Sequence, residues 1–333
     1  MKKVLSLVLV LVMVFSLAAC GKTEGNSQGS GKPQSYSLGT ASSGGMMYAI
    51  GSGWASLMNN VAGDRYSFTA EETAGNSANI AMIESGEIEF CCNGTMSLYE
   101  GYQGKANWTS GNTYNKIRVM FPLNQMVLTA YTLEENNIHS LSDLEGKVVG
   151  LGSKGGAVDS LFRSLFDELG IKVKDYYNDG WSATVSALSD GNIDAGITFQ
   201  LSPAAALVEL DSTKNVAFLN FTDKEISALK TLNPALADAK IAAGSYKSVT
   251  EDIKTVGDIA LMCCSVDVPD DVVYDLVKTT YENASDMQAT HNAMSKWSID
   301  DVSKCIAQFH PGAIKYFEEK GIKMPDPTVV PSK

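Results

Sequence analysis

Histidine and arginine are scarce in this chain of 333 residues. The three histidines, His139, His291 and His310, lie far apart in the sequence. A zinc site needs paired ligands at a set spacing, and acid–base catalysis needs a base placed beside the reacting group. Neither pattern is present, so we expect no metal site and no enzymatic activity. Arginine is equally rare, and only Arg118 could reach a ligand cleft, so a bidentate arginine clamp is not indicated.

The glycine-rich stretch between residues 38 and 54 lacks the features that nucleotides need. Gly44-Gly45 is followed by Met46-Met47-Tyr48, where a P-loop requires lysine and then serine or threonine. The dinucleotide pattern G-x-G-x-x-G is also missing from this stretch. We therefore expect no nucleotide and no other cofactor.

The balance of charge and the cysteine count exclude further classes. A formal net charge of −12 disfavours nucleic acid as a partner. After Cys20 five cysteines remain, which is an odd number, and the adjacent pairs Cys91-Cys92 and Cys263-Cys264 favour small core residues over a disulfide framework.

The first residues have the layout of an export signal. Two lysines precede an apolar run from Val4 to Leu17 that is too short for a permanent membrane span. The sequence Leu-Ala-Ala-Cys20 is similar to a bacterial lipobox, so we predict a signal peptide over 1–19 and lipidation of Cys20. Residues 20–35 have no large hydrophobic side chain after the cysteine and are predicted to be a flexible tether. An ordinary signal with an incidental Cys20 is the alternative.

One order of elements occurs twice in the chain. Strand, glycine turn and helix alternate from "YSLGT" to "EIEFCCN", and again from "GKVVGLG" to "NIDAGITF". Helical spacing of apolar residues predicts helices near 47–61, 75–86, 158–169 and 182–191. Alternating strands and helices predict an α/β fold with parallel sheets covered on both faces.

Two long apolar segments, 116–133 and 253–269, are candidates for crossings between two lobes. We predict a first lobe formed by 36–122 and 260–333 and a second lobe formed by 123–259. A single division near residue 140 would also explain the pattern.

The glycine turns are the predicted binding site. In parallel sheets, ligands lie where strands lead into helices, and the first N–H groups of a helix favour an anion. Hydroxyl, amide and glycine positions at these turns predict a cleft for a small carboxylate. The predicted ligand-binding residues are Thr40, Ser42, Ser43, Gly44, Gly45, Tyr48, Thr73, Gly75, Asn76, Ser77, Asn93, Ser153, Lys154, Gly155, Gly156, Phe199 and Gln200. The serine, threonine and asparagine residues could instead serve only as helix N-caps.

At these residues the chain resembles the TAXI-type solute receptors of TRAP transporters. Their pattern G-T-G-S-x-G-G-T-Y-Y-P-L-G is matched at residues 39–51, and their T-x-G-S-x-x-N pattern at Thr73, Gly75 and Asn79. The segment 190–210, with Pro203 opening a helix, and "HPGAIKYFEEKG" at 310–321 are similar to later family segments. The chain departs from the family at Ala41, at Met46-Met47 and at 155–158, where both family hydroxyls are absent.

The resemblance implies a two-lobed type II periplasmic-binding-protein fold with a hinge and a ligand cleft between the lobes. It implies a glutamate- or 2-oxoglutarate-like ligand or another amino acid, and membrane permease subunits driven by an ion gradient. We expect a monomer that is lipid-anchored on the outer side of the cell membrane. The binding lipoprotein of an ABC importer is the alternative, followed by an exported enzyme that uses Glu71, Glu72 or Asp159. His310 is predicted to cap or underlie the last helix, in which Tyr316 and Phe317 are core residues.

Overall fold

The computed structural model describes residues 32–305 and 307–325. The predicted signal peptide, Cys20 and most of the tether lie outside these residues. The last two residues of the predicted tether, Gln34 and Ser35, belong to the first strand. Among the described residues no helix combines the length and the apolar character needed to cross a membrane.

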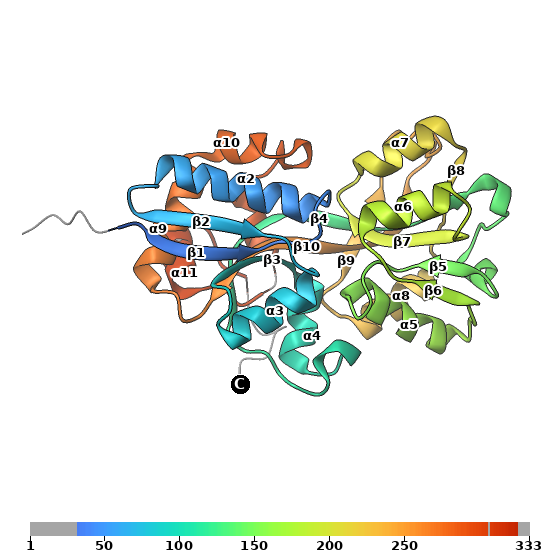
Figure 1. Ribbon diagram of the computed structural model, residues 1–333, viewed down its shortest axis with the longest axis horizontal. Helices are drawn as coiled ribbons and strands as arrows, with labels where there is room; N and C mark the ends of the chain where they lie inside the picture. The colour runs from blue at the N-terminus through green and yellow to red at the C-terminus, as the bar shows by residue number, and fades with distance from the viewer. Residues whose placement is uncertain (1–31, 306, 326–333) are drawn as a thin grey trace, which may run out of the picture. The chain divides into compact units, whose positions relative to one another are not determined.

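The first predicted unit forms as the sequence indicates (Figure 1). Each helix that was predicted from apolar spacing is present, and α3 ends at Gly86 in the left-handed conformation that favours glycine. The elements are β1 (Gln34–Gly39), α2 (Met46–Val61), β2 (Tyr66–Glu71), α3 (Asn76–Ser85), β3 (Phe90–Gly94) and α4 (Thr95–Gln103).

The second unit repeats this order and then continues. Two short strands, β8 and β9, were not predicted. The elements are β5 (Val148–Gly150), α5 (Ala157–Leu169), β6 (Asp175–Tyr177), α6 (Trp181–Ser189), β7 (Ala195–Gln200), α7 (Ala205–Thr213), β8 (Val216–Phe218), α8 (Asp223–Leu232) and β9 (Ala237–Ile241). Short 3₁₀ turns occupy Asn107–Thr109, Glu134–Asn136, Leu141–Leu144, Asn292–Met294 and Ile299–Lys304.

The two apolar crossing segments are long strands, β4 (Ile117–Leu133) and β10 (Ile253–Ser265). They join both units into one sheet with the order β2-β1-β3-β10-β4-β7-β5-β6, while β8 pairs with β4 and β9 with β10. β10 is antiparallel to β3 and β4, and β4 is antiparallel to β7. The prediction of purely parallel sheets is therefore wrong for the central strands, because β4 and β10 are antiparallel to the strands beside them.

The sheet thus has a first end, β2-β1-β3, and a second end, β7-β5-β6. The chain returns to the first end through α9 (Asp270–Glu282), α10 (Ala284–Ala289) and α11 (Pro311–Glu319). Trp54 Nε1 of α2 donates a hydrogen bond of 2.9 Å to Thr280 Oγ1 of α9. Phe309, just before α11, bridges to Val119 of β4. These contacts tie the last helices to α2 and to the first part of β4.

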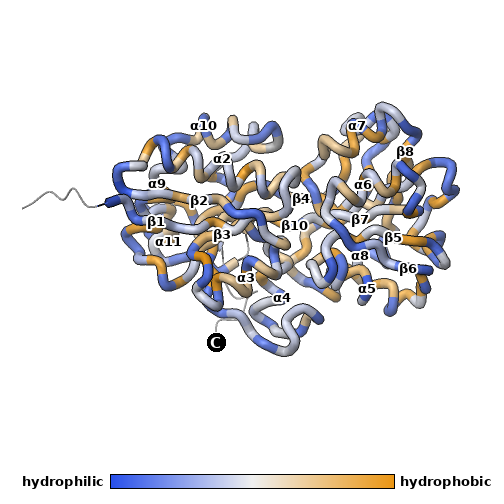
Figure 2. The backbone as a smooth tube through the Cα atoms, in the orientation of Figure 1, coloured by the Kyte–Doolittle hydropathy of each residue, from blue (hydrophilic) through white to orange (hydrophobic). Residues whose placement is uncertain are grey.

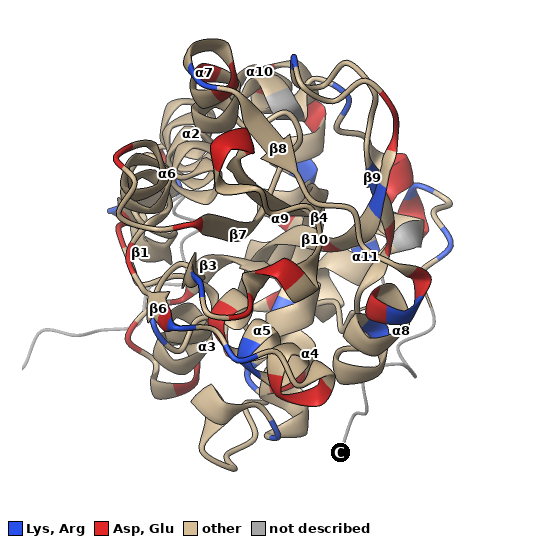
Figure 3. Cartoon of the chain, turned by 90° about the vertical axis from the view of Figure 1, so that its right-hand side faces the viewer, with Lys and Arg blue, Asp and Glu red and all other residues tan. Residues whose placement is uncertain are grey.

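The apolar residues form the core along the sheet. The tube in Figure 2 shows apolar stretches within the elements and mostly hydrophilic loops at their ends. All five cysteines after Cys20 are buried and free, which confirms their prediction as core residues. Tyr316 and Phe317 are also buried, as predicted. Charged residues are spread over the outer helices and loops of the second end (Figure 3).

Candidate functional site

Two glycine turns from opposite ends of the sheet face each other. α2 begins after the turn 42–45, and α6 begins after Gly180. A Cβ atom placed on Gly44 would lie 3.2 Å from Ser182 Oγ, and one placed on Gly180 would lie 3.6 Å from Ser42 Oγ. The turns are therefore neighbours across the gap between the first and second ends.

The helices that start after glycine turns receive no side-chain cap from their N-cap residues. α2, α3, α5 and α6 begin after Gly45, Gly75, Gly156 and Gly180, and none of these four cap residues gives a side-chain acceptor to its helix. Glycine has no side chain that could cap, so the first N–H groups keep their partial positive charge. The N-termini of α2 and α6 lie at the facing turns and can hold an anion between them.

Three acidic side chains already occupy other donors around the site. Glu72 Oε1 accepts hydrogen bonds from Ser43 N at 2.8 Å and Ser43 Oγ at 3.1 Å. Asp159 Oδ2 accepts from Gly155 N at 3.0 Å, and Asp258 Oδ1 accepts from Met96 N at 2.8 Å. The glycine turns thus bind carboxylates, which is the chemistry predicted for the ligand. The carboxylates bound in the structure are side chains of the protein itself.

Asp258 is the most buried of these acids. It lies on β10 where the strand crosses between the two ends, and its Oδ1 also accepts from Thr95 Oγ1 at 2.6 Å. Burial raises its pKa to about 6, against the lowering effect of the Thr95 and Met96 hydrogen bonds. This carboxylate therefore supplies the cap of α4, whose N-cap residue is Gly94.

Several predicted residues at the first end are committed to internal bonds. The Thr40 hydroxyl is buried and donates to Glu71 O at 2.6 Å, and Thr73 Oγ1 donates to Thr40 O at 3.1 Å. Asn93 is also buried, and its Nδ2 donates to Asn76 O at 3.0 Å. These residues hold the strand ends and turns in place.

The remaining predicted residues at the first end are more accessible. Ser43 and Gly44 are exposed, whereas Ser42, Tyr48 and Ser77 are half-buried. Met46 and Met47, where the TAXI-type pattern has threonine and tyrosine, are buried in the core. The methionines therefore stabilise the start of α2 by packing.

The predicted residues at the second end lie on two strands' ends. Lys154 is exposed, and Ser153, Gly155 and Gly156 are half-buried in the turn before α5. Phe199 is buried and Gln200, which pairs with Val127 of β4, is half-buried. Arg118 Nη1 donates to Asn115 O at 2.6 Å and Ile117 O at 2.8 Å, which holds it to the start of β4.

Gly180 and Ser182 are not among the predicted site residues, but the structure places them opposite Ser42 and Gly44. The sequence feature that indicates Gly180 is a glycine directly before an apolar helix, which is also the feature that predicts the turns at Gly45 and Gly75. Asp258 was not predicted as a functional residue. It lies in an apolar strand segment, and the sequence does not show that its side chain caps α4, which is distant in the chain.

Residues 150–155 read G-L-G-S-K-G and match the dinucleotide pattern after a strand and before a helix. In a dinucleotide site the loop N–H groups bind a pyrophosphate. Here Gly155 N donates to the buried Asp159, which also bonds Arg163 Nε at 2.8 Å. A carboxylate in this position would repel a pyrophosphate. We therefore still expect that this loop binds no nucleotide.

His310 has the structural role that was predicted for it. Its Nδ1 accepts a hydrogen bond of 3.2 Å from Gly312 N, which caps α11, and Pro311 is the first residue of that helix. The imidazole is buried, and burial lowers its pKa despite the nearby Asp270.

Several solved structures are similar to this chain. An ancestral arginine-binding protein bound to arginine matches with a TM-score of 0.50 and 14% identity, over 80% of this chain and 99% of that chain. The substrate-binding protein of an amino acid ABC transporter matches with a TM-score of 0.47 and 11% identity, over 77% and 96%. The GluR0 ligand-binding core in complex with L-glutamate matches with a TM-score of 0.47 and 10% identity, over 80% and 99%.

The strand order and the likeness to the arginine-binding protein give this chain the type II periplasmic-binding-protein fold. A profile of the NMT1-like family matches residues 38–321, which is most of the described chain and includes both facing turns. The protein therefore belongs to the NMT1-like family.

Proposed function

We propose that this protein is an extracytoplasmic solute-binding protein that closes two lobes on a small carboxylate and delivers it to a membrane permease. The observation on which this depends is the pairing of the 42–45 turn with the 180–182 turn. Each turn leads into a helix without a side-chain cap, so an anion between them would be stabilised by N–H groups from both sides. Only the closed form makes both sets of contacts, so ligand binding favours closure.

The lobes of this proposal are the two ends of the sheet, with 36–122 and 260–333 in the first and 123–259 in the second. The hinge lies on β4 and β10. Their register shifts between the pairs Ile259–Gln125 and Leu261–Pro122, and Pro122 has no N–H for the ladder. An irregular stretch in the two crossing strands is a suitable place for a bend.

We infer a TRAP-type permease as the partner, on the TAXI-type patterns at 39–51 and 310–321. Lipidation of Cys20 would anchor the monomer to the outer side of the cell membrane. The binding protein of an ABC importer is the second candidate, because the type II fold by itself serves either kind of permease. A neighbouring gene for a permease without an ATPase would favour the first candidate.

The ligand class can be tested by a thermal-shift screen of the chain from Pro33 onward, which forms one compact unit. Carboxylates and amino acids are expected to raise the melting temperature, because a ligand that binds only the native state stabilises it. Stabilisation by sugars or simple cations without any effect of carboxylates would contradict the proposal.

A charge placed between the turns tests the site itself. Ser182→Asp puts an acid beside Gly44 and should weaken carboxylate binding about ten-fold or more by like-charge repulsion. Ser186→Asp, on the same helix and also exposed, is the matched control and should bind as the wild type does. Equal affinities of the two variants in calorimetry would exclude this turn as the anion site.

A further inference from the structure

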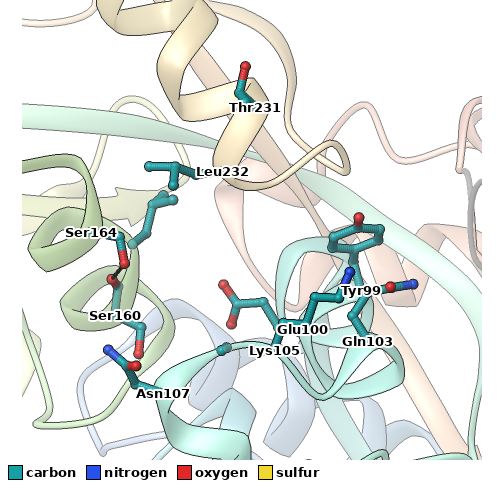
Figure 4. A pocket seen from close by; sticks show the side chains of 11 residues that line it. Tyr99, Glu100, Gln103, Lys105, Asn107, Ser160, Ser164, Thr231 and Leu232 are labelled. Carbon is teal, nitrogen blue, oxygen red and sulfur yellow. Dashed lines mark hydrogen bonds between the residues drawn. The ribbon is translucent and has the colours of Figure 1, made fainter. Parts of the chain in front are cut away.

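A separate cavity of about 300 Å³ lies between helices of the two ends of the sheet. α4 and the loop after it form one wall, and α5 and α8 form the other (Figure 4). None of the predicted ligand-binding residues lines it. The lining residues on which the argument depends are Glu100 from α4, Ser160 and Ser164 from α5, and Lys105 from the loop.

Glu100 is the acid of this cavity. Its carboxylate points from α4 across the cavity toward α5, where Ser160 and Ser164 lie (Figure 4). Trp108 Nε1 donates to Glu100 Oε2 at 2.7 Å, and Asn233 Nδ2 donates to Oε1 at 3.3 Å. A carboxylate can accept about four hydrogen bonds, so about half of its acceptor capacity remains for a ligand.

The charge around Glu100 is not balanced. Among the described residues no lysine or arginine forms an ion pair with it, and Lys105 is exposed at the cavity rim. On the facing helices, α5 contributes hydroxyls, and Lys230 of α8 is paired with Asp238 at 2.6 Å. Asp258 on β10 adds a second negative charge behind α4. A half-buried acid without a cation is a favourable place for a positively charged group.

The two serines on α5 complete the set of acceptors. Ser164 Oγ donates to Ser160 O at 3.0 Å, which leaves the lone pairs of this hydroxyl oxygen available. Ser160 lies one turn earlier on the same face. An ammonium group has three N–H donors, and it needs three acceptors when it leaves water.

We propose that this cavity binds a primary ammonium group, which donates to the remaining lone pairs of Glu100 and to the hydroxyl oxygens of Ser160 and Ser164. The ammonium group can belong to an amino acid or to a free amine. Because the walls come from both ends of the sheet, an occupant would hold them together. The inference shares the two-lobed closure with the proposed function but depends on other residues.

The pH dependence of binding is a supporting readout. Burial raises the pKa of Glu100 to about 7, while the hydrogen bonds from Trp108 and Asn233 act to lower it. An ammonium ligand stabilises the ionised carboxylate and so lowers this pKa. Binding near pH 7 should therefore release protons, and the affinity for the amine should rise between pH 6 and pH 8.

The experiment is ligand-observed NMR on the chain from Pro33 onward, with ethylammonium, glycine, glutamate, acetate and tetramethylammonium as probes. Ethylammonium should bind with a dissociation constant on the order of 1 mM or weaker, as its size allows. Tetramethylammonium has the same charge without N–H donors and should not bind. Binding of ethylammonium identifies a free-amine site, whereas binding of the amino acids alone identifies their ammonium group as the ligand only where Glu100→Gln weakens it.

Variants decide whether Glu100 is responsible. Glu100→Gln should weaken ammonium ligands about ten-fold or more, while Glu87→Gln, at an exposed acid on the first end, should leave them unchanged. Ser164→Ala keeps both hydrogen bonds to Glu100 and should weaken binding roughly three-fold. This variant tests the cavity even where Glu100→Gln folds poorly.

Two results would overturn the inference: no binding of ethylammonium or any amino acid, or equal binding by wild type and both cavity variants. Acetate separates this failure from that of the proposed function. Glu100→Gln should leave acetate binding unchanged, whereas Ser182→Asp should weaken it about ten-fold or more without affecting ethylammonium.

Discussion

At the scale of single residues, the candidate site is a balance between backbone donors and acids of the chain. Ser43 offers an N–H and a hydroxyl at the start of α2, and Glu72 accepts from both. Asp159 has the same relation to Gly155. A ligand carboxylate that enters the first turn therefore competes with Glu72 for the same donors.

Removing this competitor should increase affinity. Glu72→Ala frees the N–H and the hydroxyl of Ser43, so we expect a carboxylate to bind about three-fold more tightly or better, as measured by calorimetry. Glu72 is exposed, so the melting temperature should change little. Glu87→Ala is the control for loss of an exposed acid at the same end. Unchanged or weaker binding by Glu72→Ala would show that Ser43 does not contact the ligand.

At the scale of elements, local signals were reliable because they depend on neighbouring residues. Gly86 ends α3 with a φ of 77°, and Gly45 and Gly75 precede their helices as predicted. His310 caps α11 and is followed by Pro311 at the first helical position. These features arise from backbone conformation within a few residues, so the sequence alone displays them.

The cap of α11 is testable by substitution. His310→Ala removes the acceptor of Gly312 N and empties a buried position, and it should lower the free energy of unfolding by about 1–2 kcal/mol or more. His310→Asn restores a capping acceptor and should recover part of the loss. Urea denaturation measures both variants. A full loss in the asparagine variant would show that packing of the imidazole, and not its hydrogen bond, stabilises α11.

At the scale of the whole molecule, β4 and β10 decide the architecture. β10 pairs with β3 of the first end, β4 pairs with β7 of the second end, and the antiparallel pairing between β4 and β10 joins the two ends. The sequence showed two long apolar segments but gave no register and no direction. Those depend on contacts between residues more than 100 positions apart, such as Asp258 with Met126.

Two acids near this crossing, the buried Asp258 and the half-buried Glu100, should make the stability depend on pH. Burial raises the pKa of Asp258 to about 6 and that of Glu100 to about 7, from ordinary values of 3.8 and 4.5. The folded state therefore holds these protons more tightly than the unfolded chain. Their contribution is complete below pH 4 and is lost as the pH rises toward 7, so the unfolding free energy should fall by on the order of 2–3 kcal/mol for each group.

Urea denaturation at pH 4.5, 6 and 7.5 measures this slope in the chain from Pro33 onward. A variant that combines Asp258→Asn with Glu100→Gln should have a flatter profile than the wild type over this range. Parallel profiles for the two proteins would show that other groups govern the dependence.

The sequence by itself determined the alternating elements, the glycine turns, the helix ends and the apolar crossing segments, because each is set by local backbone preference and by the spacing of apolar residues. Only the tertiary structure decided which turns meet, with Ser42 and Gly44 opposite Gly180 and Ser182. It also decided that Glu72, Asp159 and Asp258 occupy donors, and that Glu100 faces a cavity between two helices. The reason is that the closeness of distant residues depends on how the strands pair and cross.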